Sequence, residues 1–264
     1  LVLVNTRGAI EEITAFNPDF AFFQEVDTNS TRSFQVNQFK MLQESLAKMA
    51  SVHVSNFHSA YLFYPILDPH GVVNSGIATF SKYKIDKVIR KSLEITDAFP
   101  SKFFDLDRCF SASYLKTNHD NYLVIVNVHL SAYDKGGVYR KKQLQQLNSF
   151  LEVEYQKGNY VVCGGDFNHD IANSMYVFET KQEKPEWVYA LNNDDLNENF
   201  SFATNNNIPT CRSTDMPYEK NVNYTVVLDG FIVSKNVDVI MVENVDTNFE
   251  YSDHNPVYMK FVLK

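Results

Sequence analysis

The sequence predicts an α/β protein in which two packed, mixed β-sheets are flanked by helices, giving a sandwich of four layers. Two observations lead to this prediction. Short runs rich in aromatic and β-branched residues recur along the 264 residues, and a few segments with helical spacing lie between them. Hydrophobic residues make up 44% of the chain, which is enough for a large core, and the length suits one domain spanning residues 1–264.

The amino-terminal part of the chain predicts two helices around one strand. The first helix is expected in residues 8–17, where apolar residues recur at helical spacing until Pro18. The next run, DFAFFQEVD, is short and aromatic, and it predicts a buried strand that ends at Gln24 and Glu25. A second helix is expected from residue 31 to about residue 50.

Strands dominate the middle of the chain. Shorter strand signals, separated by Gly, Pro and Asn, lie at residues 61–64, 77–80 and 111–115. The run NYLVIVNVHLS is a stronger signal, with its valines on one face and Asn127 and His129 on the other. A helix is predicted over residues 138–156, and YVVCGGDFN is a further strand in which Cys163 is expected to be a small buried hydrophobe.

The last third of the chain combines an irregular segment with three strands. Residues 171–218 are polar, Asn-rich and weakly periodic, so they predict a long excursion. Trp187, the only tryptophan, either shapes the rim of a substrate site or packs the excursion against the core. The three closing strands are YTVVLDGFIVS, VDVIMVENV and NPVYMKFVL.

Charge and cysteine content exclude some classes of protein. The formal charge of -8 argues against a protein that coats nucleic acid electrostatically, although a bound divalent cation would still allow a nuclease. The three cysteines form no CxxC pair and predict neither a zinc site nor a disulfide framework. We expect a monomer without an obligate protein partner.

Five polar clusters follow or interrupt apolar strands, at QEVD, NVHLS, GGDFNHD, VLDGF and YSDHNP. If these strand ends converge, they form one pocket of acids, amides and histidines. Its members are Glu25, His129, Asp166, Asn168, Asp229, Asp253 and His254. Carboxylate oxygens suit Mg²⁺ or Mn²⁺, and histidines supply an acid or base near neutral pH.

Each cluster alone has a simpler interpretation. GGDFNHD and SDHNP are both typical of turns. Glu25 alone is consistent with a solvated carboxylate, and His129 with a hydrogen-bonded core histidine. Asp229 lies inside an apolar strand, where an unpaired carboxylate is costly, so a partner is expected under either interpretation.

The ordered series PDFAFFQEVD, SGIATFSKYKI, DRCFSASYL, NVHLS, GGDFNHD, LDGFIVS and SDHNPV resembles the endonuclease/exonuclease/phosphatase superfamily over most of the chain. That family includes deoxyribonuclease I, bacterial sphingomyelinases and inositol polyphosphate phosphatases. The resemblance implies that Glu25 binds magnesium and that Asp253 is a second acidic group near the metal. It also implies that Asp166 and Asn168 orient the attacking water and stabilise the transition state.

The remaining matched residues concern the phosphate group. His254 matches a histidine that contacts phosphate or serves as general base, with Asp229 as its orienting carboxylate. His129 matches a histidine that donates to a phosphate oxygen or to the leaving group. Arg108 resembles a family arginine near the phosphate, and a surface arginine is the alternative.

One feature departs from the family pattern. The family usually places a metal-associated Asn at the end of its first strand, and Asn5 is the only nearby candidate. Asn5 is close to Glu25 for a strand end, a turn and a helix to fit between them. Either this connection is trimmed, or the first strand lies upstream of the sequence.

The resemblance implies hydrolysis of a phosphodiester, in nucleic acid or phospholipid, by Mg²⁺- or Mn²⁺-assisted in-line attack of water. The alternatives are a phosphomonoesterase and a binding module that recognises a phosphorylated ligand without cleaving it. Similar proteins of Gram-positive bacteria often carry an amino-terminal membrane segment. We therefore expect an extracytoplasmic location, anchored through a segment outside this sequence, with a cytoplasmic location as the alternative.

Overall fold

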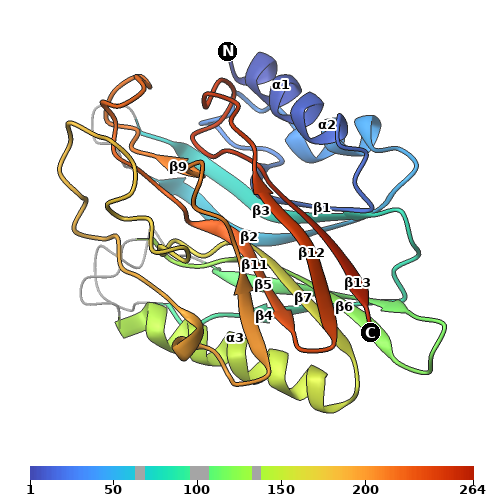
Figure 1. Ribbon diagram of the computed structural model, residues 1–264. Helices are drawn as coiled ribbons and strands as arrows, with labels where there is room; N and C mark the ends of the chain where they lie inside the picture. Colours follow the sequence, from blue (N-terminus) through green and yellow to red (C-terminus); the bar gives the residue numbers. More distant parts are fainter. Residues whose placement is uncertain (63–68, 96–106, 133–137) are drawn as a thin grey trace.

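Two layers of strands lie between two layers of helices in the computed structural model, which describes residues 1–62, 69–95, 107–132 and 138–264. Helices α1 (Val2–Thr14) and α2 (Gln38–Ser45) lie on one outer face, and α3 (Val138–Gln156) lies on the opposite one (Figure 1). This arrangement is the four-layer sandwich that the sequence predicts.

One sheet has six strands in the order β4-β5-β6-β7-β11-β8. Their bounds are β4 (Lys87–Ser92), β5 (Cys109–Lys116), β6 (Tyr122–His129), β7 (Tyr160–Asp166), β11 (Asp229–Ser234) and β8 (Phe200–Ala203). The central pair, β6 and β7, is parallel, and the other pairs are antiparallel. A parallel pair needs a long crossover, and α3 provides it.

The facing layer contains two separate sheets with antiparallel pairing. One has the order β1-β3-β2 and the other pairs β12 with β13. Their bounds are β1 (Phe20–Asp27), β3 (Gly71–Ser81), β2 (Ala50–Leu62), β12 (Val237–Asn244) and β13 (Val257–Leu263). A short ribbon of β9 (Cys211–Arg212) and β10 (Thr225–Val226) lies outside both layers.

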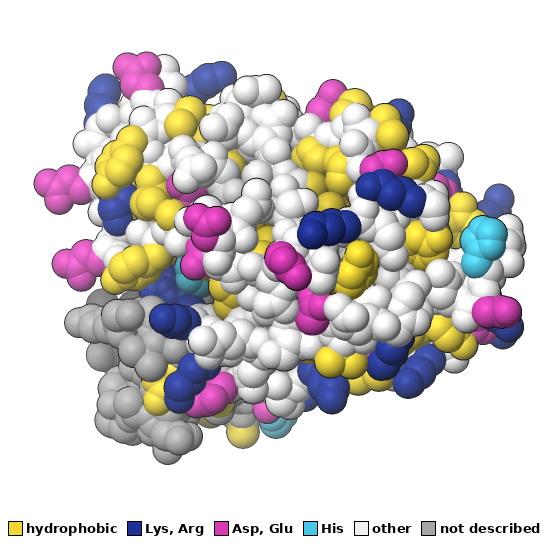
Figure 2. Space-filling model, turned by 60° about the horizontal axis from the view of Figure 1, so that its bottom comes forward, with side chains coloured by type: hydrophobic (Ala, Val, Ile, Leu, Met, Phe, Trp, Pro, Cys, Tyr) yellow, Lys and Arg dark blue, Asp and Glu magenta, His cyan; other side chains and the backbone are white. Residues whose placement is uncertain are grey.

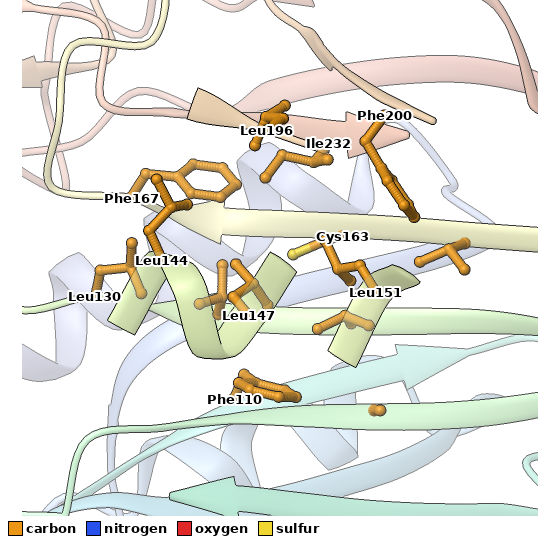
Figure 3. Close-up of a cluster of buried hydrophobic side chains, with 14 of the residues drawn as sticks. Phe110, Leu130, Leu144, Leu147, Leu151, Cys163, Phe167, Leu196, Phe200 and Ile232 are labelled. Atoms are coloured by element: carbon orange, nitrogen blue, oxygen red, sulfur yellow. The ribbon is translucent and has the colours of Figure 1, made fainter. Parts of the chain in front are cut away.

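The alternation predicted for residues 122–129 is confirmed and explains how β6 serves two cores. Its valines enter the cluster beneath α3, which contains Leu144, Leu147 and Leu151 (Figure 3). Ile125, on the other face, enters the core between the sheets. Asn127 and His129 share that face and are fully or nearly fully buried.

The helix predicted for residues 31–50 is wrong over most of its length. Phe34 and Gln35 have positive φ angles, which a helix does not allow. The side chain of Asn37 caps α2 by accepting a hydrogen bond from the Lys40 N–H, so the helix begins only at Gln38. Residues from Ala50 onward already belong to β2.

Two other predictions are corrected. The excursion at 171–218 contains η2 (Asn193–Asp195), β8 and β9, and β8 extends the six-stranded sheet. The strand predicted at 224–234 is interrupted, because Thr210 Oγ1 accepts the backbone N–H groups of Leu228 and Asp229 in place of a strand partner. The sequence signal at 61–64 extends beyond the described residues after Leu62.

No helix among the described residues is long and apolar enough to cross a bilayer.

Candidate active site

The site forms where three neighbouring strands of the six-stranded sheet carry polar residues. His129 at the end of β6 is the register partner of Asp166 at the end of β7. Asp229 at the start of β11 is the partner of Asp166 on its other side. Because paired residues on adjacent strands lie about 5 Å apart, the register alone brings these three side chains together.

A glycine allows this approach. Gly165 has a φ of +145°, and a Cβ atom there would lie 2.0 Å from the carbonyl oxygen of Val128. No residue with a side chain fits that space without displacing the β6 backbone. The close contact between β6 and β7 therefore requires a glycine at the position immediately before Asp166.

Asp166 is the centre of the cluster. Its Oδ1 accepts the backbone N–H of Asn168 at 2.7 Å, and its Oδ2 lies 3.5 Å from His129 Nε2 and 3.9 Å from His254 Nε2. Burial, followed by the negative charge of Asp229, raises the pKa of Asp166 to about 7. This carboxyl group can therefore gain or lose a proton near neutral pH.

His254 and Asp229 form the closest ion pair of the cluster. His254 Nδ1 lies 2.8 Å from Asp229 Oδ2, so the predicted partner of Asp229 is present. Burial alone would lower the pKa of His254, but the Asp229 carboxylate outweighs it and holds the pKa well above the usual value. His254 is accordingly a cation whose Nε2 faces Asp166.

His129 has the opposite protonation state. Its Nδ1 lies 3.3 Å from the side-chain nitrogen of Asn56, whose oxygen accepts the Cys109 N–H at 2.9 Å. That second bond orients the amide, so Asn56 donates to Nδ1 and the Nε2 hydrogen points toward Asp166. Burial, then the positive charges of Arg108 and His254, holds the pKa of His129 well below its usual value. His129 is a neutral donor.

Arg108 lies close enough to affect both groups electrostatically. Its charge lowers the pKa of His129 and of Asp166. Arg108 is only 7% exposed, so the alternative of a surface arginine is wrong. Its position is compatible with a role at a phosphate group.

Glu25 reaches the rim of the site through an irregularity in β1. The register of β1 against β3 shifts between Phe23 and Val26, and Glu25 has a φ of +52°. Such a bulge redirects a side chain at the end of a strand. Glu25 is exposed, and its carboxylate lies 3.5 Å from Arg32 Nη2.

Several residues that hold the site strands in place were not among the predicted site residues. Gln24 donates to the Asn127 side-chain oxygen at 2.8 Å, and Asn127 donates to the Ala78 carbonyl at 2.9 Å. These bonds tie β1 and β3 to β6 two residues before His129. An amide on a buried strand face was the available signal for Asn127, but nothing in the sequence identifies its partners.

Arg32 and Asp27 form a second group that sequence reasoning missed. The Arg32 guanidinium binds both oxygens of Asp27, at 2.9 and 3.0 Å, and Asp27 is buried. The charges of Glu25, Asp27 and Asp253 all act on Arg32. This arginine therefore links a buried carboxylate to the acidic rim.

The metal-ligating residues are only partly brought together. Among the described residues, one group of three or more acid, histidine or cysteine side chains has donor atoms all within 4.8 Å of one another, namely Asp166, Asp229 and His254. Glu25 and Asp253 line the same groove as that group but lie outside this distance.

The turn-like motif GGDFNHD contributes both to the site and to a turn. In GGDFNHD, Asp170 accepts backbone N–H groups of Ala172, Ser174 and Met175, so this acid does stabilise a turn. Asn168 is buried, and its side chain donates to the Leu130 carbonyl at 2.7 Å. The turn interpretation and the site interpretation thus apply to different residues of one motif.

Two candidates remain, Asn5 and Trp187. Asn5 lies within α1 and not at the end of a strand, so it does not occupy the position of the family Asn. Trp187 packs against the buried cluster of Val188, Cys211, Tyr224, Val226 and Leu228, which supports its packing role.

The fold and site together define a phosphoesterase-type sandwich, with acids and histidines at the ends of its central strands. The chain belongs to the Endonuclease/Exonuclease/phosphatase family, which matches residues 3–254. Members of this family are hydrolases that act on phosphate esters.

Individual relatives are distant. The inositol phosphosphingolipids phospholipase C of Schizosaccharomyces pombe is 24% identical over 81% of this chain, and the match spans 58% of that protein. The human Nocturnin catalytic domain has a TM-score of 0.64 at 18% identity, and the match covers 98% of this chain and 86% of the chain in that structure. A mannosyl-6-phosphatase of Bacteroides thetaiotaomicron has a TM-score of 0.63 at 16% identity, covering 99% and 92%. The structural likenesses establish the fold.

Replacing Asp229 with Asn tests the ion pair. Without the carboxylate, burial dominates, so we expect the pKa of His254 to fall, which an NMR titration of its imidazole measures. Asp238→Asn, an exposed position on β12, is the control and should leave that titration unchanged. An unaltered His254 titration in Asp229→Asn would contradict the assigned pair.

Replacing Arg32 with Ala tests the link to Asp27. The change leaves a buried carboxylate unpaired, which typically costs about 3–5 kcal/mol. Because the Arg32 side chain is 27% exposed, we expect the lower end, about 3 kcal/mol in the free energy of unfolding measured with urea. Arg7→Ala, on the exposed face of α1, should cost less than about 0.5 kcal/mol. Equal stability of the two variants would count against the proposed role of Arg32.

Proposed function

We propose that the protein is a divalent-metal-dependent phosphodiesterase whose reaction takes place at the Asp166 cluster. One observation carries the proposal. The Asp166 carboxyl group, whose pKa burial raises to about 7, lies 3.5 Å from His129 Nε2 and 3.9 Å from His254 Nε2, and the pKa values of these two histidines are shifted in opposite directions. Groups of opposite protonation state around one acid supply both the proton acceptor and the donors that ester hydrolysis needs.

The roles follow from those protonation states. Asp166 accepts a proton from the attacking water, whose oxygen forms the new bond to phosphorus while the ester P–O bond breaks. His254, as a cation, binds a phosphoryl oxygen, and Asp229 keeps it oriented. His129 donates from Nε2 to the oxygen of the phosphate or the leaving group. This proposal assigns the general-base role to Asp166, whereas the family resemblance also allows His254 to be the general base.

Glu25 and Asp253 are the proposed ligands of Mg²⁺ or Mn²⁺. Both offer oxygen donors on the accessible rim, and hard divalent cations prefer such donors and keep water in their other positions. Asp229 and His254 are already bonded to each other, which leaves them less suited to hold the cation. When bound, the cation polarises a phosphoryl oxygen and neutralises developing charge.

Among phosphodiesters, we favour a phospholipid or another small substrate over duplex nucleic acid. The chain carries a net charge of -8, and acidic and basic side chains are interspersed over the described residues on the face in Figure 2. A protein that tracks a nucleic-acid backbone usually has a basic stripe. The relative from Schizosaccharomyces pombe is named for a phosphosphingolipid substrate. A phosphomonoesterase and a non-catalytic binding module are the alternatives.

Replacing Asp166 with Asn, or His254 with Gln, should reduce hydrolysis of bis(p-nitrophenyl) phosphate in Mg²⁺ by about 10²- to 10⁴-fold, because each change removes a proton-transfer or charged group. Asp120→Asn and His119→Gln change the same residue types at exposed positions and should retain activity. Circular dichroism checks that each variant is folded. Full turnover in a folded Asp166→Asn variant would exclude the proposed base.

Calorimetric titration with Mg²⁺ tests the metal ligands apart from turnover. Glu25→Gln should weaken Mg²⁺ binding at least tenfold, because a carboxylate ligand becomes a neutral amide. Glu44→Gln, on the exposed surface of α2, should bind as the parent does. If Glu25→Gln binds normally but His254→Gln does not, the cation belongs to the Asp166, Asp229 and His254 group.

A substrate panel separates the functional alternatives. Sphingomyelin, inositol phosphosphingolipid, single-stranded DNA, RNA and p-nitrophenyl phosphate are compared with Mg²⁺ and with chelator. We expect chelator-sensitive cleavage of a lipid diester at least tenfold faster than cleavage of DNA or the monoester. Preference for the monoester would favour a phosphatase, and binding without cleavage of any substrate would favour a binding module.

A further inference from the structure

Arg32 is a cation at the acidic rim of the site. Its Nη2 lies 3.5 Å from a carboxylate oxygen of Glu25, and the charge of Asp253 also acts on it. In turn, the charge of Arg32 acts on His129. Because electrostatic effects of this kind fall off with distance, the guanidinium lies near both parts of the site, the acidic rim and the histidine cluster.

The Arg32 guanidinium is only partly used within the protein. It carries five N–H donors. Nε and Nη2 donate to the two oxygens of buried Asp27, at 3.0 and 2.9 Å, and Nη2 also lies 3.4 Å from Ser75 Oγ. Nη1 bonds to none of the described residues, and it is not enclosed, since the side chain is 27% exposed. Two N–H donors of a fixed guanidinium are therefore open to a ligand.

The loop that carries Arg32 is bonded to β3. The hydroxyl of fully buried Ser30 accepts the Asn74 N–H at 2.8 Å, and the Thr31 hydroxyl accepts the Val72 N–H at 3.1 Å. The Thr31 N–H donates to the Val72 carbonyl at 2.8 Å. The loop therefore presents Arg32 in one position before any ligand arrives, which reduces the entropy that binding must overcome.

The charges around His129 favour an anionic ligand. Burial comes first in lowering the pKa of His129, and the charges of Arg108, His254 and Arg32 lower it further. Three cations thus converge on a neutral imidazole, and an anion between them removes the cost of their mutual repulsion. A phosphate group suits this arrangement, since its oxygens match the planar fork of a guanidinium. Pairing with Asp27 alone explains Nε and Nη2 but leaves Nη1 without a role.

We propose that Arg32 is a further substrate-binding residue, whose Nη1 and Nη2 groups donate to a non-bridging oxygen of the substrate phosphate on the Glu25 side of the site. Asp27 holds the guanidinium in place for this contact. The inference rests on the proposed function, which brings a phosphate group to the Asp166 cluster. Because such an oxygen is present both in the diester and in the product phosphate, Arg32 binds substrate and product alike. Its loss therefore raises KM and weakens phosphate binding more than it lowers kcat.

Two variants separate this contact from the structural bond to Asp27. The double variant Asp27→Asn/Arg32→Gln replaces the ion pair with two neutral amides, so no unpaired charge remains buried. Arg32→Lys keeps a cation beside Asp27 but loses the planar fork. Asp238→Asn/Lys264→Gln, which removes an exposed ion pair elsewhere on the surface, is the matched control.

Calorimetric titration with inorganic phosphate in Mg²⁺ is the main measurement. We expect the double variant to raise the Kd for phosphate about tenfold or more, because a charge-assisted hydrogen bond is lost, and Arg32→Lys to raise it about threefold. The Kd for Mg²⁺ alone should stay within about threefold of the parent value, because Glu25 is unchanged. With bis(p-nitrophenyl) phosphate, KM should rise about tenfold while kcat falls less than about threefold. The control should match the parent in all three measurements.

Unchanged phosphate binding in a folded double variant would overturn the inference. So would an equal loss of Mg²⁺ and phosphate binding, since Arg32 would then act only by keeping Glu25 in position. If circular dichroism shows that the double variant is not folded, Arg32→Lys alone decides by the same criteria. A parent that binds phosphate through Arg32 but hydrolyses no phosphodiester would contradict the proposed function and leave the phosphate contact standing.

Discussion

The burial of the Asp166 carboxyl group is the constraint on which the site depends. A carboxylate removed from water is costly unless hydrogen bonds and opposite charges compensate it. Here the Asn168 N–H, the cationic His254 and the buried Arg108 provide that compensation, while neighbouring Asp229 opposes it. The balance leaves a pKa of about 7, so the residue retains a proton-accepting function at the pH where a hydrolase works.

Contacts between the two strand layers keep this arrangement in place. The amide of Asn56, in β2, connects His129 to the backbone of Cys109, and Gln24 in β1 connects to Asn127 in β6. Each bond joins the facing layer to the six-stranded sheet through a buried polar group. Such groups are costly when unpaired, so they favour one relative position of the layers and thereby one geometry of the site.

The sequence predicted the strand-end residues because their signal is local: a polar residue at the end of an apolar run is visible without knowing the fold. It could not reveal the roles of Asn56 and Gln24, because their partners are brought close only by folding: Asn56 is 73 positions from His129, and Gln24 is 103 positions from Asn127. Local chemistry also misled the prediction of a helix at residues 31–50, where left-handed backbone at Phe34 interrupts a helical pattern. Edge strand β4 was missed because three of its six residues are basic, which protects a sheet edge but weakens the strand signal.

The protonation states of the site residues are harder to predict from the sequence than their positions are. His129 and His254 are the same residue type, and both approach Asp166 through Nε2, at 3.5 and 3.9 Å. Both rings are buried, but Asp229 outweighs burial and raises the pKa of His254, whereas burial, then the charges of Arg108 and His254, lowers the pKa of His129, whose Nδ1 faces an amide. A neutral amide at Nδ1 does not offset the cost of burying a positive charge, whereas the Asp229 carboxylate at His254 does. The difference between donor and cation at this site is therefore set by what lies behind each imidazole, one step removed from the reacting groups.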